Sequence, residues 1–197
     1  MRKLAFACGT AALLAGCSTA PAPEPLPPAA AVDPNNPLFA PGYIAMAASG
    51  DQFEIQSAQL ALQMSQNQAV RNFANLLVAH HTMTTQNLVA SAQSAGLQPP
   101  PPTLLPQHQQ MLDQLRASGG GSQFDMAFRD IQVAAHQQAL QLHQNYAASG
   151  DVPALRAVAG QTVPVIQQHL TQAQALNVAP PPPPPQVQPG RMAGERG

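Results

Sequence analysis

The sequence predicts an all-α protein built on a four-helix bundle, and three observations lead to this fold class. Four long segments carry apolar residues at three- and four-residue spacing, the period of one helix face. No segment alternates apolar and polar residues with the valine enrichment typical of strands. Proline-rich stretches within residues 17–41 and 180–197 leave residues 42–179 as the part that can fold, which is one domain's worth of chain.

The four long helices are expected to have matched lengths of about 25 residues, or roughly 37 Å at the helical rise. Helices of equal length that carry one apolar stripe each bury those stripes against one another as a bundle. The predicted helices span residues 42–66, 68–95, 123–148 and 152–177.

Repeated strings and prolines indicate where these helices end. Ala-Ala-Ser-Gly-Asp occurs at residues 47–51 and again at 147–151. Pro153 follows the second copy, so we expect Gly150 to end the third long helix and Asp151 to cap the fourth. No proline follows the first copy, so the first helix should run through it. Pro164 lies inside the fourth helix, where it removes a backbone hydrogen bond.

A short extra helix is expected between the second and third long helices. Thr103 could cap a helix over residues 104–117, and the glycines at 119–121 would release it. This segment could run along the bundle, which would make the second and third long helices parallel. It could equally fold over one end, and the sequence leaves both arrangements open.

The first 16 residues have the form of a bacterial lipoprotein signal peptide. Arg2 and Lys3 make a positive start, an apolar run extends over residues 4–15, and Leu-Ala-Gly precedes Cys17. Cys17 would then carry the acyl chains, which anchor a protein stably when more than one is attached. In similar Gram-negative lipoproteins a residue other than Asp after the cysteine, here Ser18, implies the outer membrane. Residues 17–41 are expected to form an extended tether and residues 180–197 a disordered tail.

Charge is scarce in this sequence. Only 9% of the residues are charged, against about 25% in ordinary soluble proteins. Removal of the signal peptide leaves six basic and nine acidic side chains and no basic cluster, so nucleic acid is excluded as an expected partner. Because so few carboxylates could have shifted pKa values, we expect the stability of the bundle to change little with pH.

Three histidines and one glutamate are expected to meet at the middle of the bundle. His81 and His169 each lie four residues after an apolar residue of their stripes and therefore face inward. His136 lies toward the edge of the third helix's apolar face, and Glu54 flanks the stripe of the first. All four positions are near the midpoints of their helices, and this alignment holds whichever way a helix runs.

These side chains allow two interpretations. Three imidazoles and a carboxylate suit zinc, iron or copper. Alternatively, the four side chains bond to one another or to glutamines and hold the helices in register without an ion. The residues three before the histidines are Val78, Val133 and Ile166, so the Glu-x-x-His pairs of a di-iron centre are absent. Metal-bound histidines usually have a carboxylate or carbonyl on the other ring nitrogen, and the sequence identifies no such partner for these three.

Three stretches, at residues 49–88, 124–140 and 155–176, resemble the exported proteins called domain of unknown function 4142. The resemblance covers about residues 39–176. It includes an acid in the first helix, matched by Glu54, and histidine motifs matched by residues 73–81, 124–136 and 163–170. It implies a ferritin-like four-helix bundle that is secreted or lipid-anchored, and it implies no particular activity.

The expected protein is therefore an outer-membrane lipoprotein that presents a helical bundle to the periplasm. No nucleophile motif or phosphate-binding loop is present, so no enzymatic turnover is expected. The expected role is structural or interactive within the cell envelope, without a cofactor. The alternative is a mononuclear metal-binding or metal-storage protein that holds a divalent transition metal with Glu54, His81, His136 and His169. The sequence names neither a protein partner nor an oligomeric state.

Overall fold

The computed structural model describes residues 33, 35–99 and 101–178, all within one compact unit, Val32–Gly197. The predicted signal peptide, the lipidated Cys17, most of the tether and the proline-rich tail lie outside the described residues. The predictions made for those segments therefore remain predictions.

The described residues form five helices and contain no strand, which confirms the all-α fold class. No helix in the described part of the chain is both long and apolar enough to cross a bilayer. The bounds of the long helices lie within two residues of those predicted, and the start of α2 is as predicted. The helices are α1 (Ala40–Met64), α2 (Gln68–Ser94), α3 (Pro106–Ala117), α4 (Ser122–Ser149) and α5 (Pro153–Ala175).

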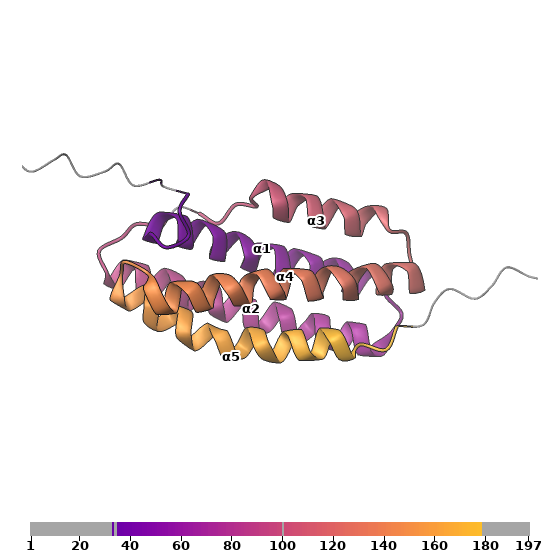
Figure 1. Ribbon diagram of the computed structural model, residues 1–197. Coiled ribbons are helices and arrows are strands. Elements are labelled where there is room, and N and C mark those ends of the chain that lie inside the picture. Colours follow the sequence, from indigo (N-terminus) through magenta and orange to yellow (C-terminus); the bar gives the residue numbers. More distant parts are fainter. Residues whose placement is uncertain (1–32, 34, 100, 179–197) are drawn as a thin grey trace, which may run out of the picture. The chain divides into compact units, whose positions relative to one another are not determined.

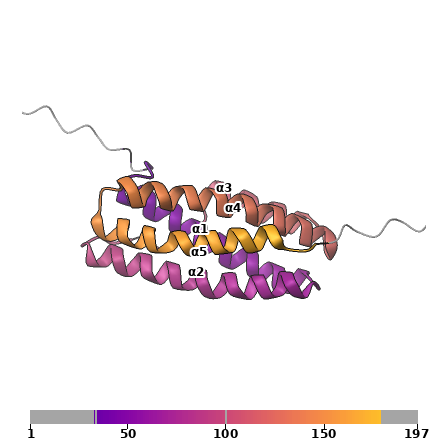
Figure 2. The ribbon, with the colours of Figure 1, turned by 60° about the horizontal axis from the view of Figure 1, so that its bottom comes forward.

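The four long helices pack in the cyclic order α1, α2, α5, α4. Each helix contacts the next in this order, and Figures 1 and 2 show these neighbours running in opposite directions. The diagonal pairs, α1 with α5 and α2 with α4, are consequently parallel. The sequence left the relative direction of the second and third long helices open, and the structure shows that they are parallel.

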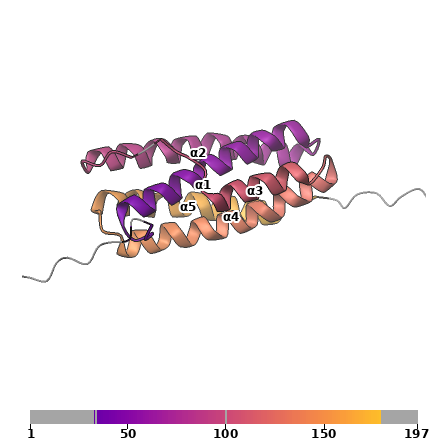
Figure 3. The same cartoon turned by 90° about the horizontal axis from the view of Figure 1, so that it is seen from above.

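Helix α3 explains this topology, because it carries the chain back along the bundle before α4 begins. It lies outside the four-helix core over the seam between α1 and α4 (Figure 3). Leu112 and Leu115 bury its apolar face. Ser49 of α1 holds its first turn: the Ser49 hydroxyl accepts a hydrogen bond from the Leu105 amide at 2.7 Å and bonds Nδ1 of His108 at 2.6 Å.

The helix ends correct two predictions. Thr103 does not cap α3, which begins at Pro106 without a side-chain cap. Asp151 does not cap α5 either, because its carboxylate accepts a hydrogen bond from the Tyr146 hydroxyl at 2.8 Å. Both helices begin with proline, whose missing N–H falls where the helix has no partner for one. Gly150 ends α4 as predicted, and α1 runs through its Ala-Ala-Ser-Gly-Asp copy as predicted.

The core consists of two apolar clusters separated along the bundle by polar side chains. One cluster includes Phe53, Phe73 and Phe128, and the other includes Tyr43 and Leu155. On each long helix the two clusters use opposite halves, as the observed helix directions require. Between them lie buried ionisable groups that we call the polar layer: Asp51, Glu54, His81, His136 and His169.

Candidate metal centre

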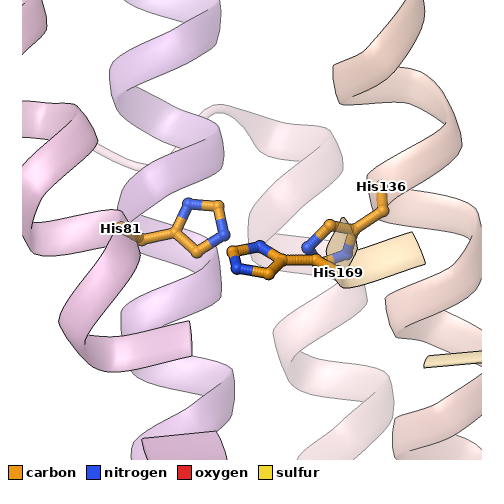
Figure 4. A group of neighbouring side chains, drawn as sticks. All are labelled: His81, His136 and His169. Atoms are coloured by element: carbon orange, nitrogen blue, oxygen red, sulfur yellow. The ribbon is translucent and has the colours of Figure 1, made fainter. Parts of the chain in front are cut away.

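The three histidines of the polar layer converge from three different helices. His81 comes from α2, His136 from α4 and His169 from α5. One ring nitrogen of each lies within 4.8 Å of those of the other two, and the rings are drawn together in Figure 4. Their side chains are almost completely buried, with exposures of 2%, 1% and 0%. The structure therefore brings together the three histidines named from the sequence.

Each of these histidines has one ring nitrogen held by a neighbouring group. His81 Nδ1 lies 2.8 Å from an Asp51 carboxylate oxygen. His136 Nδ1 donates to the Gln132 main-chain carbonyl at 2.8 Å. His169 Nε2 lies 2.8 Å from Nδ1 of the half-buried His80. Metal-binding histidines usually have such a partner on the second nitrogen, which fixes the ring's orientation and proton position.

The remaining ring nitrogens have no partner. They are His81 Nε2, His136 Nε2 and His169 Nδ1, and each is shielded from solvent. A carbonyl only accepts, so the His136 proton is on Nδ1 and its lone pair is on Nε2. A His169 that donates from Nε2 to His80 likewise keeps its lone pair on Nδ1. A buried polar atom without a partner costs about 1–3 kcal/mol, so three such atoms at one place call for an explanation.

Asp51 is the centre of the hydrogen bonds on the α1 side. Besides its bond to His81, its oxygens accept from the hydroxyls of Thr84 at 2.9 Å and Thr85 at 3.0 Å. This carboxylate, which is 7% exposed, is thus held on both oxygens. Through its bond to His81 Nδ1, Asp51 fixes the orientation of the His81 ring.

Glu54 lies beside the three histidines without joining their group of ring nitrogens. One of its oxygens is 3.6 Å from His136 Nδ1, and the other is buried without a hydrogen-bond partner. Glu54 is 4% exposed. It can therefore serve as a fourth ligand only through a change of side-chain rotamer, or act as a nearby negative charge.

The pKa values of the three rings differ because burial and nearby charges act on each ring differently. Burial lowers the pKa of His81, but the bond to Asp51 and the charges of Asp51 and Glu54 outweigh it and raise the pKa above 6.5. Burial lowers the pKa of His136 despite the charge of Glu54. Burial and the charges of the neighbouring histidines lower the pKa of His169 to about 2. At neutral pH two of the rings are therefore neutral, the state in which imidazole binds metal.

Two further buried histidines belong to other contacts. His108 bonds Ser49 at the start of α3, and His143 Nδ1 lies 3.0 Å from the Tyr43 hydroxyl. The sequence assigned neither to the site, and the structure agrees. His108 and His143 are therefore buried histidines outside the group of three converging rings.

Sequence reasoning missed the groups that hold the histidines. Asp51 was read only as part of a repeated string, although it lies three residues before Glu54 and therefore on the same helix face. These two are the acidic residues of α1. His80 precedes His81 directly, but no sequence pattern places it against His169, and a main-chain carbonyl such as that of Gln132 leaves no trace in a sequence pattern.

The residues present fit a transition-metal ion. Imidazole nitrogen and carboxylate oxygen suit zinc and copper, and the partnered outer nitrogens leave lone pairs aimed inward. The described residues offer no thiolate, and three ring nitrogens lie within 4.8 Å of one another. Nitrogens bound to one ion at about 2.0–2.1 Å are roughly 3.3–3.6 Å apart, so the three rings must move closer together to bind the same ion.

Comparisons with known proteins agree with this fold. Residues 25–176 match the family described as Domain of unknown function (DUF4142). No curated protein matches the chain. A solved structure named CopM in the Cu(II)-bound form is similar, with a TM-score of 0.58, 18% identity, and coverage of 70% of this chain and 94% of that chain. CopM in the Ag-bound form, obtained by co-crystallization, gives a TM-score of 0.57, 18% identity and coverage of 70% and 93%. At this identity the likeness concerns the fold.

Proposed function

This chain belongs to the family described as Domain of unknown function (DUF4142), and we propose that it is a metal-binding protein whose three buried histidines hold one divalent transition-metal ion. His81, His136 and His169 are the ligands. The ring nitrogens that face away from the ion are bonded to Asp51, the Gln132 carbonyl and His80, which fix the orientation of the rings. Glu54 supplies negative charge or a fourth ligand.

One observation carries this proposal: three solvent-shielded ring nitrogens have no partner, they belong to three rings that converge with nitrogens within 4.8 Å of one another, and the opposite nitrogens all have partners. A layer that only held the helices in register would be expected to satisfy its own polar atoms. An ion at the centre satisfies all three at once. This favours the metal-binding alternative over the purely structural role first expected from the sequence.

The charges of the polar layer favour a divalent ion. Asp51 and Glu54 are the carboxylates whose charge acts on His81. With neutral imidazoles, these two negative charges balance an ion of charge +2, whereas a monovalent ion would leave one buried charge uncompensated. Burial of an uncompensated charge is strongly unfavourable.

Copper(II) is the first ion to test, and zinc is the second. Among divalent first-row ions, affinity for a nitrogen and oxygen site peaks at copper(II). The similar CopM structures were solved with Cu(II) and with Ag bound. For this chain the choice of copper is a proposal that rests on the donor set.

The location proposed for this site is the periplasmic face of the outer membrane, with the bundle tethered through a lipidated Cys17. The support is the signal-peptide pattern of residues 1–16 and the proline-rich stretch that follows. A binding or storage role in that compartment needs no catalytic turnover, and we propose none. Incorporation of labelled palmitate in the native host, and its loss in Cys17→Ser, would test the anchor.

Metal analysis of the purified protein tests the proposed function. After incubation with Cu²⁺ and removal of free ion by gel filtration, we expect one ion per chain in the unaltered protein. His136→Gln should retain little copper, because it removes a ligand while a polar side chain stays in place. His143→Gln is the matched control, since His143 is also a buried histidine of α4 but bonds Tyr43. Equal copper in both variants would contradict the proposal.

A further inference from the structure

The three histidines cannot be reached directly from solvent. Their exposures of 2%, 1% and 0% leave no ring nitrogen on the surface. An ion that binds them must therefore pass between helices. Its route depends on how the helices pack and is not given by the three ligands alone.

A cavity of about 290 Å³ lies between α1, α3 and α4 and reaches the polar layer. Its deep end is formed by buried side chains of that layer, namely Asp51, Glu54, His81 and His136. Its rim is formed by exposed polar side chains and a proline, namely Pro37, Gln107, Gln138, Gln141 and Asn145. The cavity thus joins the surface to two of the three histidines. His169 is not part of its wall.

The cavity wall also carries groups outside the polar layer that can bind an ion transiently. Met46 supplies a thioether, and His108 and His143 supply imidazoles. None of the three belongs to the converging group of ring nitrogens. A series of weak donors between rim and depth lowers the penalty of moving a dehydrated ion away from water.

Gly50 keeps this cavity open. It lies inside α1, where glycine is less favourable than alanine by about 0.5–1 kcal/mol, so its presence needs a reason. Its backbone conformation does not require glycine, and an added Cβ would meet only His108 Cε1, at 3.9 Å. Neither backbone strain nor close packing accounts for it. Any larger side chain here would point into the cavity.

Helix α3 covers the cavity, and Ser49 of α1 anchors its first turn. Gln107 and His108, in its first turn, form part of the wall, and Ser49 bonds both His108 and the Leu105 amide. Beyond its last turn, Gly119 and Gly121 have positive φ, a conformation that few other residues adopt. We call the two Ser49 hydrogen bonds the α3 latch.

We infer that this cavity is the passage by which a divalent ion reaches His81, His136 and His169, and that the α3 latch sets how readily the passage opens. The inference rests on the proposed function, because it concerns the route to the same site. A passage changes the barrier to binding and leaves the bound and free states alone. Obstruction must therefore slow uptake and release by the same factor and leave Kd unchanged.

The test is stopped-flow Cu²⁺ uptake, followed by release to excess chelator, on the full chain. Gly50→Phe fills the cavity from α1, and Ala139→Phe fills it independently from α4, so the result does not depend on one variant's folding. Gly120→Phe is the matched control, because a Cβ there meets no atom within 4 Å. We expect both cavity variants to slow uptake and release about tenfold or more, with stoichiometry unchanged.

Loss of the α3 latch should change the rates of uptake and release in the opposite direction. Ser49→Ala removes both hydrogen bonds and should speed uptake and release by a common factor, several-fold, at unchanged Kd. Unaltered rates in both cavity variants, with one ion bound, would overturn the passage while leaving the proposed function intact. Unaltered rates in Ser49→Ala would overturn the latch. Absence of bound copper in the unaltered protein would overturn the proposed function and the passage with it.

Discussion

Asp51 is the residue whose contribution to the candidate centre is most sharply defined. It joins α1 to α2 through His81, Thr84 and Thr85, and it is the carboxylate that holds a converging imidazole in place. Groups of this kind orient the ligand and fix its proton position. Asp51 can therefore be tested apart from the ligands themselves.

We predict that Asp51→Ala weakens copper binding about 10–100-fold while stoichiometry stays at one ion per chain, the effect typical of such outer partners. The copper affinity of Asp51→Asn should lie between those of Asp51→Ala and the unaltered protein. The amide oxygen of asparagine can still accept a hydrogen bond from His81, but it carries no charge. Competition titration against a chelator of known affinity measures both. Asp113→Asn, at an exposed position paired with Arg116, is the control. Affinity equal to that of the unaltered protein in Asp51→Ala would show that Asp51 does not orient His81.

His143 gives a prediction about acid stability. Burial lowers the pKa of His143 to about 4, whereas the unfolded chain titrates near 6.5. The unfolded state therefore binds this proton first, so stability is lost as the pH falls from 6.5 toward 4 and is unaffected above that range. The loss attributable to His143 is about 3 kcal/mol at the acid end.

His143→Gln, which does not titrate, should unfold less steeply with acid. Urea denaturation of the metal-free protein at pH 7 and pH 4.5 measures the difference between variants. Identical losses in both proteins would contradict the lowered pKa. This prediction departs from the pH-insensitive bundle expected from the scarce carboxylates, because it takes account of the buried histidines.

At the scale of the helices, the position of each helix was predictable from the sequence, whereas the residues that cap α3 and α5 were not. The apolar stripes located the four long helices because a period near 3.6 residues repeats over many turns and survives local exceptions, and the glycines at 119–121 marked the end of the short one. The caps were mispredicted because Thr103 and Asp151 were assigned by residue type alone. Asp151 instead bonds Tyr146, a contact that depends on how α4 and α5 meet. The parallel pairing of α2 and α4 required the position of α3, which no periodicity encodes.

Two glycines of α1 give opposite predictions for one substitution. Gly50→Ala should stabilise the protein by about 0.5–1 kcal/mol, because alanine is more favourable within a helix and the new Cβ makes only an ordinary van der Waals contact, with His108 Cε1 at 3.9 Å. Gly42→Ala should destabilise it by more than about 1 kcal/mol, because its Cβ would clash with the Asn36 main-chain carbonyl. Midpoints of urea denaturation at unchanged slope measure both. A loss of stability in Gly50→Ala would mean that the cavity wall tolerates no added methyl group.

For the whole molecule, the sequence named the three histidines because inward-facing positions near the midpoints of equal helices meet in any bundle topology. It could not show which nitrogen of each ring faces inward, nor that Asp51, Gln132 and His80 hold the others. Those facts depend on rotamers and on contacts between helices. The preference first given to a structural role followed from this gap, since the partners expected of a metal-bound histidine were sought beside it in sequence.

The bundle as a whole should be stabilised by the ion. At a free copper concentration of 100 times Kd, binding adds about 2.7 kcal/mol to the unfolding free energy, which raises Tm by roughly 5–10 °C for a domain of this size. The double variant His136→Leu, His169→Leu keeps the Asp51–His81 pair and should show no such rise. Calorimetry with and without copper measures the difference. An equal rise in the variant would place the stabilising ion elsewhere.

The most direct measurement is pulsed electron paramagnetic resonance on protein loaded with one equivalent of Cu²⁺, because the remote nitrogen of each bound imidazole modulates the echo. Three coupled imidazoles are predicted for the unaltered protein and two for His169→Gln. Fewer than three coupled imidazoles in the unaltered protein, or a spectrum that His169→Gln leaves unchanged, would contradict the claim that His81, His136 and His169 bind the same ion.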